Sequence, residues 1–279
     1  MDFLMLIKAI ILGLVEGLTE FAPVSSTGHM IIVDDMWIKT EHFLSTHAAH
    51  TFKVVIQLGS VLAAVVYFRE RFFDLLGLKR LNRESVEGQS QGHLKLTQVI
   101  VGLIPAGVLG VLFNDYIDAH LFSTKTVLIG LVLGAVLMII ADLIGPKNPK
   151  VQSVDQITYK QALIVGLFQC LSLWPGFSRS GSTISAGVLS GMNHRAAADF
   201  TFIMAVPIMA GASLLSLLHN WHYMTADLLP FFIAGFISAF VFALLSIRFF
   251  LKLINKIKLL PFAVYRIVLA IVISFVLFF

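Results

Sequence analysis

Long apolar runs separated by short polar segments make up most of this 279-residue chain. A bilayer hydrocarbon core of about 30 Å requires roughly 20 mostly apolar residues per helical crossing. Runs that meet this requirement lie at 50–68, 97–113, 124–144, 199–218, 228–250 and 261–279. The pattern therefore predicts an all-α polytopic membrane protein with six transmembrane helices, in a single integral-membrane domain spanning 1–279.

Two further apolar stretches, 3–33 and 160–192, are each broken in the middle by polar sequence that contains glycine and proline. Irregular backbone at membrane depth is tolerated only where it is buried in protein or lines a water-filled cavity. We therefore expect each stretch to form a re-entrant helical hairpin instead of a full crossing.

The two broken stretches resemble each other. Residues 9–28 align with 162–181 without gaps, and the alignment places Ser25 on Ser178. Such self-similarity indicates a duplication.

The duplication divides the chain into a first repeat, about 1–145, and a second, about 155–279. Each repeat holds one hairpin and three crossings, and an odd number of crossings inverts the second repeat relative to the first. The hairpins then enter from opposite faces and meet near the midplane, where inverted-repeat proteins place their sites.

Composition and charge agree with a membrane protein. The chain is 58% hydrophobic and only 13% charged, whereas soluble domains carry about 25% charged residues. The net charge of +4 does not indicate nucleic acid, because the basic residues lie in loops between apolar runs. With the N-terminus outside, the basic loops 69–95 and 248–258 share one side, while 114–123 and 219–227 contain no Lys or Arg. The positive-inside rule makes the basic side cytoplasmic and places both termini on the outer side.

Glu16 and Glu20 are four residues apart, so on a helix they share one face. On a soluble helix this pair would be a solvated surface, but carboxylates inside an apolar segment are costly and usually functional. Mg²⁺ is commonly held by one or two carboxylates together with phosphate oxygens of the substrate. The pair therefore predicts a divalent metal site, for Mg²⁺ or Ca²⁺.

A run of small polar residues follows the carboxylates: Ser25, Ser26, Thr27, Gly28 and His29. One hydroxyl suits a helix N-cap, but capping does not explain three hydroxyls beside an imidazole. A helix N-terminus is also an anion site, so this run is a candidate for catalysis and phosphate binding.

The second broken stretch surrounds one arginine, Arg179, with small and hydroxyl residues: Ser178, Ser180, Gly181 and Thr183. An arginine at membrane depth needs an anionic partner. It either pairs with Glu16 or Glu20 as a structural bridge, or binds phosphate oxygens with its planar guanidinium fork.

Five histidines have spacings that suit a metal: His42, His47, His50, His219 and His222. These spacings do not supply the complete ligand set that a metal site needs. We interpret them as loop histidines.

Taken together, the two motifs closely resemble those of the bacitracin-resistance type of undecaprenyl diphosphate phosphatase. The similarity rests on the acidic pair with the Ser-Ser-Thr-Gly-His run, and on the segment from Pro175 to Ile184. It implies hydrolysis of a long-chain polyprenyl diphosphate, assisted by a divalent metal, at a site that opens toward the outer face. A second copy of the chain is a further candidate partner.

Several mechanisms remain open. Arg179 with the Ser178, Ser180 and Thr183 region would bind the diphosphate, and Ser26 would attack with His29 as base. Alternatively, His29 attacks directly or activates water. Inverted repeats with broken helices are also typical of transporters, so translocation of a polyprenyl phosphate is the alternative function.

Overall fold

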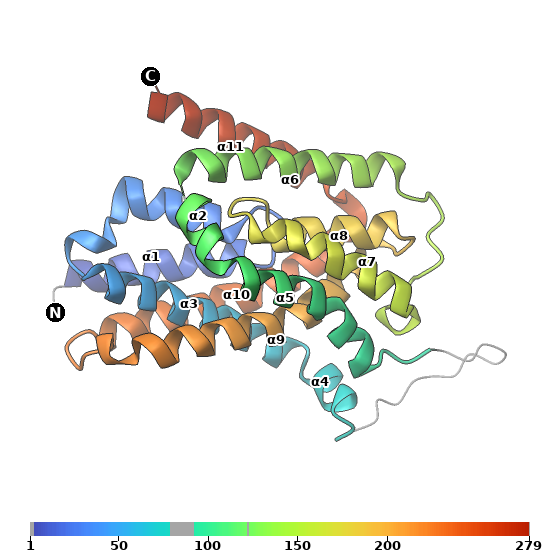
Figure 1. Cartoon of the computed structure of the whole chain (residues 1–279), viewed down its shortest axis with the longest axis horizontal. Coiled ribbons are helices and arrows are strands. Elements are labelled where there is room, and N and C mark those ends of the chain that lie inside the picture. The colour runs from blue at the N-terminus through green and yellow to red at the C-terminus, as the bar shows by residue number, and fades with distance from the viewer. Residues whose placement is uncertain (1–2, 79–91, 122, 279) are drawn as a thin grey trace.

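The computed structural model describes residues 3–78, 92–121 and 123–278, and in this part of the chain the regular structure is helical (Figure 1). The α-helices are α1 (Phe3–Thr19), α2 (Ser26–Val33), α3 (Thr46–Tyr67), α4 (Arg69–Leu75), α5 (Leu96–His120), α6 (Thr124–Ile144), α7 (Tyr159–Gln169), α8 (Arg179–Leu189), α9 (His194–Asn220), α10 (Leu229–Ile257) and α11 (Leu260–Phe278). The all-α prediction is confirmed.

The expected crossings correspond to helices. Of the described residues, five helices are long and apolar enough to cross a membrane, namely α3, α5, α6, α9 and α10. The expected sixth crossing forms α11, whose apolar part, Leu260–Val276, is shorter. Helix ends were predicted less well: α5 continues to His120 and α10 to Ile257, because polar residues beyond an apolar run extend a helix when no glycine or proline stops it. Part of the expected basic loop at 69–95 lies outside the described residues.

Both broken stretches are helix–break–helix units. In the first, α1 and α2 flank a break at 20–25, and in the second, α7 and α8 flank the segment 170–178. The first helix of each unit packs against a helix from the other half of the chain: α1 packs against α10, and α7 packs against α5. α6, of the first half, and α11, of the second, lie side by side (Figure 1).

Close backbone approach holds α1 against α10. A Cβ on Gly17 would lie 2.6 Å from the carbonyl oxygen of Ala239, so only glycine fits there. Two serines of α10 donate to carbonyls of α1: Ser238 to Ile10 at 2.8 Å and Ser246 to Leu18 at 2.9 Å. Small residues and serine hydroxyls are the usual means of helix association in membranes.

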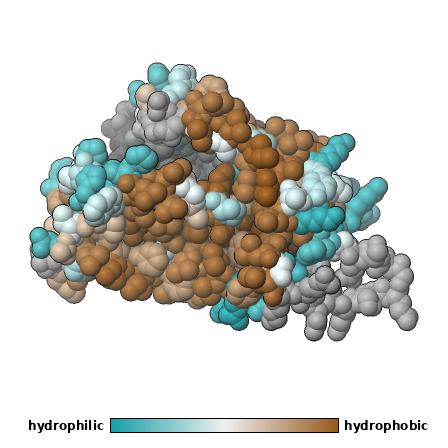
Figure 2. Space-filling view, turned by 60° about the horizontal axis from the view of Figure 1, so that its bottom comes forward, coloured by the Kyte–Doolittle hydropathy of each residue, from teal (hydrophilic) through white to brown (hydrophobic). Residues whose placement is uncertain are grey.

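The described helices run mostly along the long axis of the molecule, so their connections gather at two ends. Both termini lie at the same end as the connection between α9 and α10, and α4 lies at the opposite end (Figure 1). Figure 2 shows an apolar surface across the middle of the molecule, flanked by hydrophilic residues at both ends. This distribution is typical of a protein that spans a bilayer.

Candidate functional site

The tips of the two helix–break–helix units share one local geometry. Ser25 has φ of 72° and its hydroxyl accepts a hydrogen bond from the amide of Gly28 at 3.3 Å, which caps α2. Ser178 has φ of 75° and caps α8 by accepting from the amide of Gly181 at 3.1 Å. Each cap positions the next residue, which is Ser26 in one unit and Arg179 in the other.

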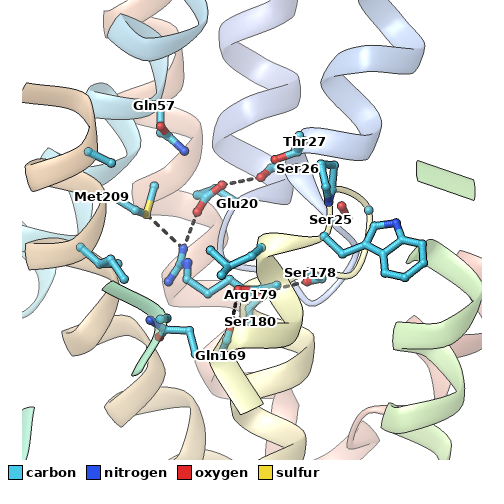
Figure 3. A pocket seen from close by; sticks show the side chains of 18 residues that line it. Glu20, Ser25, Ser26, Thr27, Gln57, Gln169, Ser178, Arg179, Ser180 and Met209 are labelled. Carbon is cyan, nitrogen blue, oxygen red and sulfur yellow. Dashed lines mark hydrogen bonds and ion pairs between the residues drawn. The ribbon is translucent and has the colours of Figure 1, made fainter. Parts of the chain in front are cut away.

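Glu20 joins these two residues (Figure 3). Its Oε2 accepts a hydrogen bond from the Ser26 hydroxyl, and its Oε1 accepts one from Nη2 of Arg179. The side chains of Glu20 and Arg179 are only 5% and 14% exposed. Three of the residues predicted to act in catalysis therefore meet in space, although they come from opposite halves of the chain.

A pocket of about 220 Å³ opens beside this group. Predicted site residues that line it are Glu20, Ser25, Ser26, Thr27, Ser178, Arg179 and Ser180. The lining also includes Gln57 of α3, Gln169 at the end of α7, Trp174 in the break before α8, and Met209 of α9, none of which the sequence marked as a site residue. Ser180 also ties the two tips together, since its hydroxyl donates to the carbonyl of Ala22 at 3.0 Å.

Several buried polar atoms of the described site have no hydrogen-bond partner: Nη1 of Arg179, Oε1 of Glu16, and both Oε1 and Nε2 of Gln169. Burying a polar group without a hydrogen bond costs free energy. Such groups are rare in native proteins and each one calls for an explanation. Arg179 and Gln169 line the pocket, whereas Glu16 is not part of its lining. The unpartnered polar atoms in the pocket wall indicate a site that binds a polar ligand.

Glu16 is buried, with 4% of its surface exposed. It lies within electrostatic range of Glu20 and Arg179. The described residues bring no third His, Cys, Asp or Glu to the acidic pair. The unpartnered oxygen of Glu16 beside a second carboxylate fits a hard cation that takes its remaining ligands from other oxygens.

His29 makes different contacts from those expected of a base for Ser26. Its Nδ1 lies 2.8 Å from the carbonyl oxygen of Ser25, and its Nε2 lies 2.7 Å from the hydroxyl of Tyr265. Because a carbonyl only accepts, Nδ1 carries the proton and Tyr265 donates to Nε2. Both ring nitrogens of His29 are thus engaged, and its side chain is not among the residues that line the pocket.

Thr183, Gly28 and Gly181 also lie outside the pocket lining. The hydroxyl of Thr183 donates to the carbonyl of Arg179 at 2.7 Å, and it contacts the hydroxyl of Thr201 at 2.9 Å. Thr183 therefore stabilises the first turn of α8 and connects it to Thr201 of α9. The two glycines supply the backbone amides that the serine caps bind.

Arg266 of α11 was not predicted. It is fully buried, and its Nη2 donates to the carbonyls of Gly176 at 2.8 Å, Phe177 at 2.9 Å and Gly130 at 3.2 Å. The bonds to Gly176 and Phe177 hold the segment that precedes Arg179, and the bond to Gly130 connects the same guanidinium to α6. A single arginine inside the apolar run 261–279 was a visible signal, since intramembrane charges are costly.

The prediction that the five spaced histidines lie in loops is wrong. His47 and His50 lie in α3 and His219 lies in α9, while His42 and His222 lie in short 3-10 helices. His47 stacks on Tyr223, with ring centroids 4.7 Å apart. Among the described residues, no group of three potential metal ligands forms.

The fold and site define a multi-pass helical membrane protein with a polar, arginine-containing pocket between its two broken helical units. The bacitracin resistance protein BacA family matches residues 9–272. The chain belongs to this family.

Relatives are similar along the whole chain. An undecaprenyl-diphosphatase of Geobacillus sp. (strain WCH70) is 76% identical over 278 residues, covering 100% of both chains. The undecaprenyl-diphosphatase of Bacillus subtilis (strain 168) is 63% identical over 268 residues, covering 96% of each.

Proposed function

We propose that this chain hydrolyses undecaprenyl diphosphate to undecaprenyl phosphate and inorganic phosphate. The reaction recycles the lipid carrier for cell-wall glycan synthesis and gives resistance to bacitracin. The observation that carries the proposal is the convergence of Ser26 and Arg179 on Glu20. A nucleophile, a proton acceptor and a phosphate-binding guanidinium are the groups that phosphoryl transfer requires. The names of the full-length relatives support the same reaction.

In the proposed mechanism, Arg179 binds the diphosphate and neutralises its charge, which is the main catalytic contribution in phosphoryl transfer. The Ser26 oxygen attacks the terminal phosphorus and its proton passes to Glu20, which already accepts it in a hydrogen bond. The bond from the terminal phosphorus to the bridging oxygen breaks, and the lipid monophosphate leaves. Water then hydrolyses the phosphoserine and releases inorganic phosphate.

His29 contributes by position in this mechanism, because it holds the carbonyl of Ser25 next to the nucleophile. Direct attack by His29, or activation of water by it, is the competing route. Both would require His29 to give up a present hydrogen bond, to Tyr265 or to Ser25.

Glu16 and Glu20 would hold a divalent ion, Mg²⁺ or Ca²⁺. When bound, the ion neutralises charge on the phosphate oxygens. The buried, unpartnered oxygen of Glu16 is the observation that favours this assignment.

The proposal includes the membrane topology. The two units are re-entrant hairpins of an inverted repeat in the plasma membrane, with both termini outside and the pocket open to the periplasmic face. The exchanged packing of α1 with α10 and α7 with α5 supports the repeat. The pocket residues Ile208, Met209 and Ala212 belong to the half of α9 that leads to 219–227, the connection without Lys or Arg. This supports the outward opening.

Release of inorganic phosphate from a prenyl diphosphate by purified, detergent-solubilised protein tests the function. Detergent leaves no membrane to cross, so release separates hydrolysis from transport. We expect the wild type to release phosphate, and Arg179→Ala and Glu20→Ala to abolish release. His47→Ala, on the same protein but outside the pocket, serves as the control. A folded wild type that releases no phosphate would overturn the proposal.

A further inference from the structure

Gln169, at the end of α7, is a buried amide without hydrogen bonds. Only 2% of the residue is exposed, and neither Oε1 nor Nε2 has a partner among the described residues. Its side chain lines the pocket that contains Glu20, Ser26 and Arg179. A primary amide offers two N–H donors and one acceptor, so this position combines a high cost of burial with direct access to the site.

The place of Gln169 relative to Arg179 suggests what it binds. Figure 3 shows Glu20 and Gln169 on opposite sides of the Arg179 guanidinium. On the side of Glu20, Nη2 of Arg179 is engaged, whereas Nη1 has no hydrogen-bond partner within the described part of the chain. Unpartnered donors of an arginine and of an amide in one pocket fit phosphate oxygens, which only accept when ionised.

The internal alignment adds a charge argument. Gln169 occupies the position that Glu16 occupies in the first repeat. A carboxylate there would repel a phosphate, since like charges a few ångströms apart repel strongly in a pocket of low dielectric constant. The neutral amide instead lets an anion approach this wall of the pocket, while the acid in the first repeat suits a cation.

We propose that Gln169 binds the phosphate that stays on the lipid, together with Nη1 of Arg179. This inference rests on the proposed function. Ser26 attacks the terminal phosphorus on the Glu20 side of Arg179, so the inner phosphate lies on the Gln169 side. When the bond to the bridging oxygen breaks, its electron pair remains on the leaving lipid monophosphate. The Gln169 amide then donates to oxygens whose negative charge is increasing.

The test measures the affinity of two inhibitors for three proteins. The proteins are the wild type, Gln169→Leu and Gln169→Glu. Methylenediphosphonate is a non-hydrolysable ligand with two phosphoryl groups, and inorganic phosphate has one. We expect Gln169→Leu to weaken binding of methylenediphosphonate about 10-fold, as for a lost hydrogen bond to a charged group. Gln169→Glu weakens it further through repulsion. Inorganic phosphate, which takes the terminal position, binds both variants as it binds the wild type.

A structural role for Gln169 gives a different pattern. If both inhibitors lose affinity equally, or if neither variant changes the affinity for methylenediphosphonate, the proposal is wrong. Gln161→Glu is the matched control, because it makes the same chemical change earlier on α7 at a residue that caps the helix and bonds the carbonyl of Ser190. Glutamate has nearly the same shape as glutamine. If Gln169→Leu does not fold, the comparison of Gln169→Glu with the wild type still tests the proposal.

Calorimetric binding of methylenediphosphonate separates this inference from the proposed function, because it requires no turnover. A wild type that binds the diphosphonate but releases no phosphate from a prenyl diphosphate contradicts the function alone. Turnover by the wild type with unchanged diphosphonate binding in both Gln169 variants contradicts the inference alone.

Discussion

Ser25 and Ser178 adopt the same uncommon backbone conformation at equivalent points of the two broken helical units. Their φ angles are 72° and 75°, and each hydroxyl caps the helix that follows. Residues other than glycine seldom adopt positive φ. The matched conformation directs Ser26 and Arg179 from opposite halves of the chain toward Glu20, which is how the two repeats build one pocket.

Because of this conformation, glycine should replace Ser178 better than alanine does. Alanine loses the cap and keeps a Cβ that disfavours positive φ, whereas glycine at an N-cap costs only a few tenths of a kcal/mol. We expect Ser178→Ala to lower the free energy of unfolding by about 1 kcal/mol more than Ser178→Gly. Thermal unfolding in detergent measures this difference. Ser190, with φ of −84° at the other end of α8, is the control, and there glycine should bring no advantage. Equal losses for both Ser178 variants would show that the backbone strain is absent.

His29 should support catalysis without carrying the phosphoryl group. Tyr265→Phe removes the hydrogen bond to Nε2 of His29 but keeps the stacked ring, with centroids 5.6 Å apart. We expect kcat to fall about 2- to 10-fold, as for loss of one neutral hydrogen bond. Ser26→Ala should abolish turnover, and His29→Gln should retain part of it. Rapid quench with a labelled substrate checks the assignment, since label on His29 instead of Ser26 would rule it out.

Replacing Arg266 by lysine should lower both stability and activity. Its guanidinium donates to two carbonyls in the segment that leads to Arg179 and to the carbonyl of Gly130 in α6, and a lysine ammonium cannot reproduce that planar fork. We expect Arg266→Lys to cost about 2 kcal/mol or more of stability. Loss of activity should accompany it, because the tip of the second unit loses its support. Arg248→Lys, at an exposed position of α10, should leave both unchanged. Wild-type stability in Arg266→Lys would contradict the claim that Arg266 holds the segment before Arg179.

Asp34 should make stability depend on pH in the acid range. It lies beyond α2, outside the membrane-spanning helices. Burial raises the pKa of Asp34, but the Lys53 ammonium at 2.6 Å and two hydrogen bonds from Thr40 outweigh burial, so the pKa is lowered. A lowered folded-state pKa gives stabilisation that is complete above the unfolded value of about 3.9 and is lost as pH falls through the folded value.

The measurement for Asp34 is the unfolding temperature between neutral pH and strong acid. Asp34→Asn should remove part of the acid-induced decrease, while Asp227→Asn, at an exposed position, should not. An identical pH profile for Asp34→Asn and wild type would contradict the ion pair with Lys53.

The sequence was sufficient for features that depend on local composition or on the cost of buried charge. Apolar length identified α3, α5, α6, α9 and α10, because a bilayer sets that length directly. A pair of Arg179 with Glu16 or Glu20 was one of two expected arrangements, because a charge in an apolar segment needs a partner, and coordinates were needed to identify Glu20 as that partner.

Other contacts were not predicted because they depend on tertiary packing. Nothing near His29 in the sequence indicates Tyr265, which α11 brings from the far end of the chain. The hydrogen bond from Ser26 to Glu20 depends on the turn at Ser25, which composition does not encode. Two residues had a visible signal in the sequence: Arg266 is an arginine in an apolar run, and Gln169 aligns with Glu16. Only the coordinates show that Arg266 bonds backbone carbonyls and that the Gln169 side chain has no partner among the described residues.

The most direct test of the central claim is a structure of the protein with a non-hydrolysable prenyl methylenediphosphonate. We predict that the terminal phosphorus lies next to the Ser26 oxygen and that Arg179 contacts the phosphonate oxygens in the pocket. Binding of the two phosphonates elsewhere, with Arg179 and Glu20 still paired only with each other, would contradict the account.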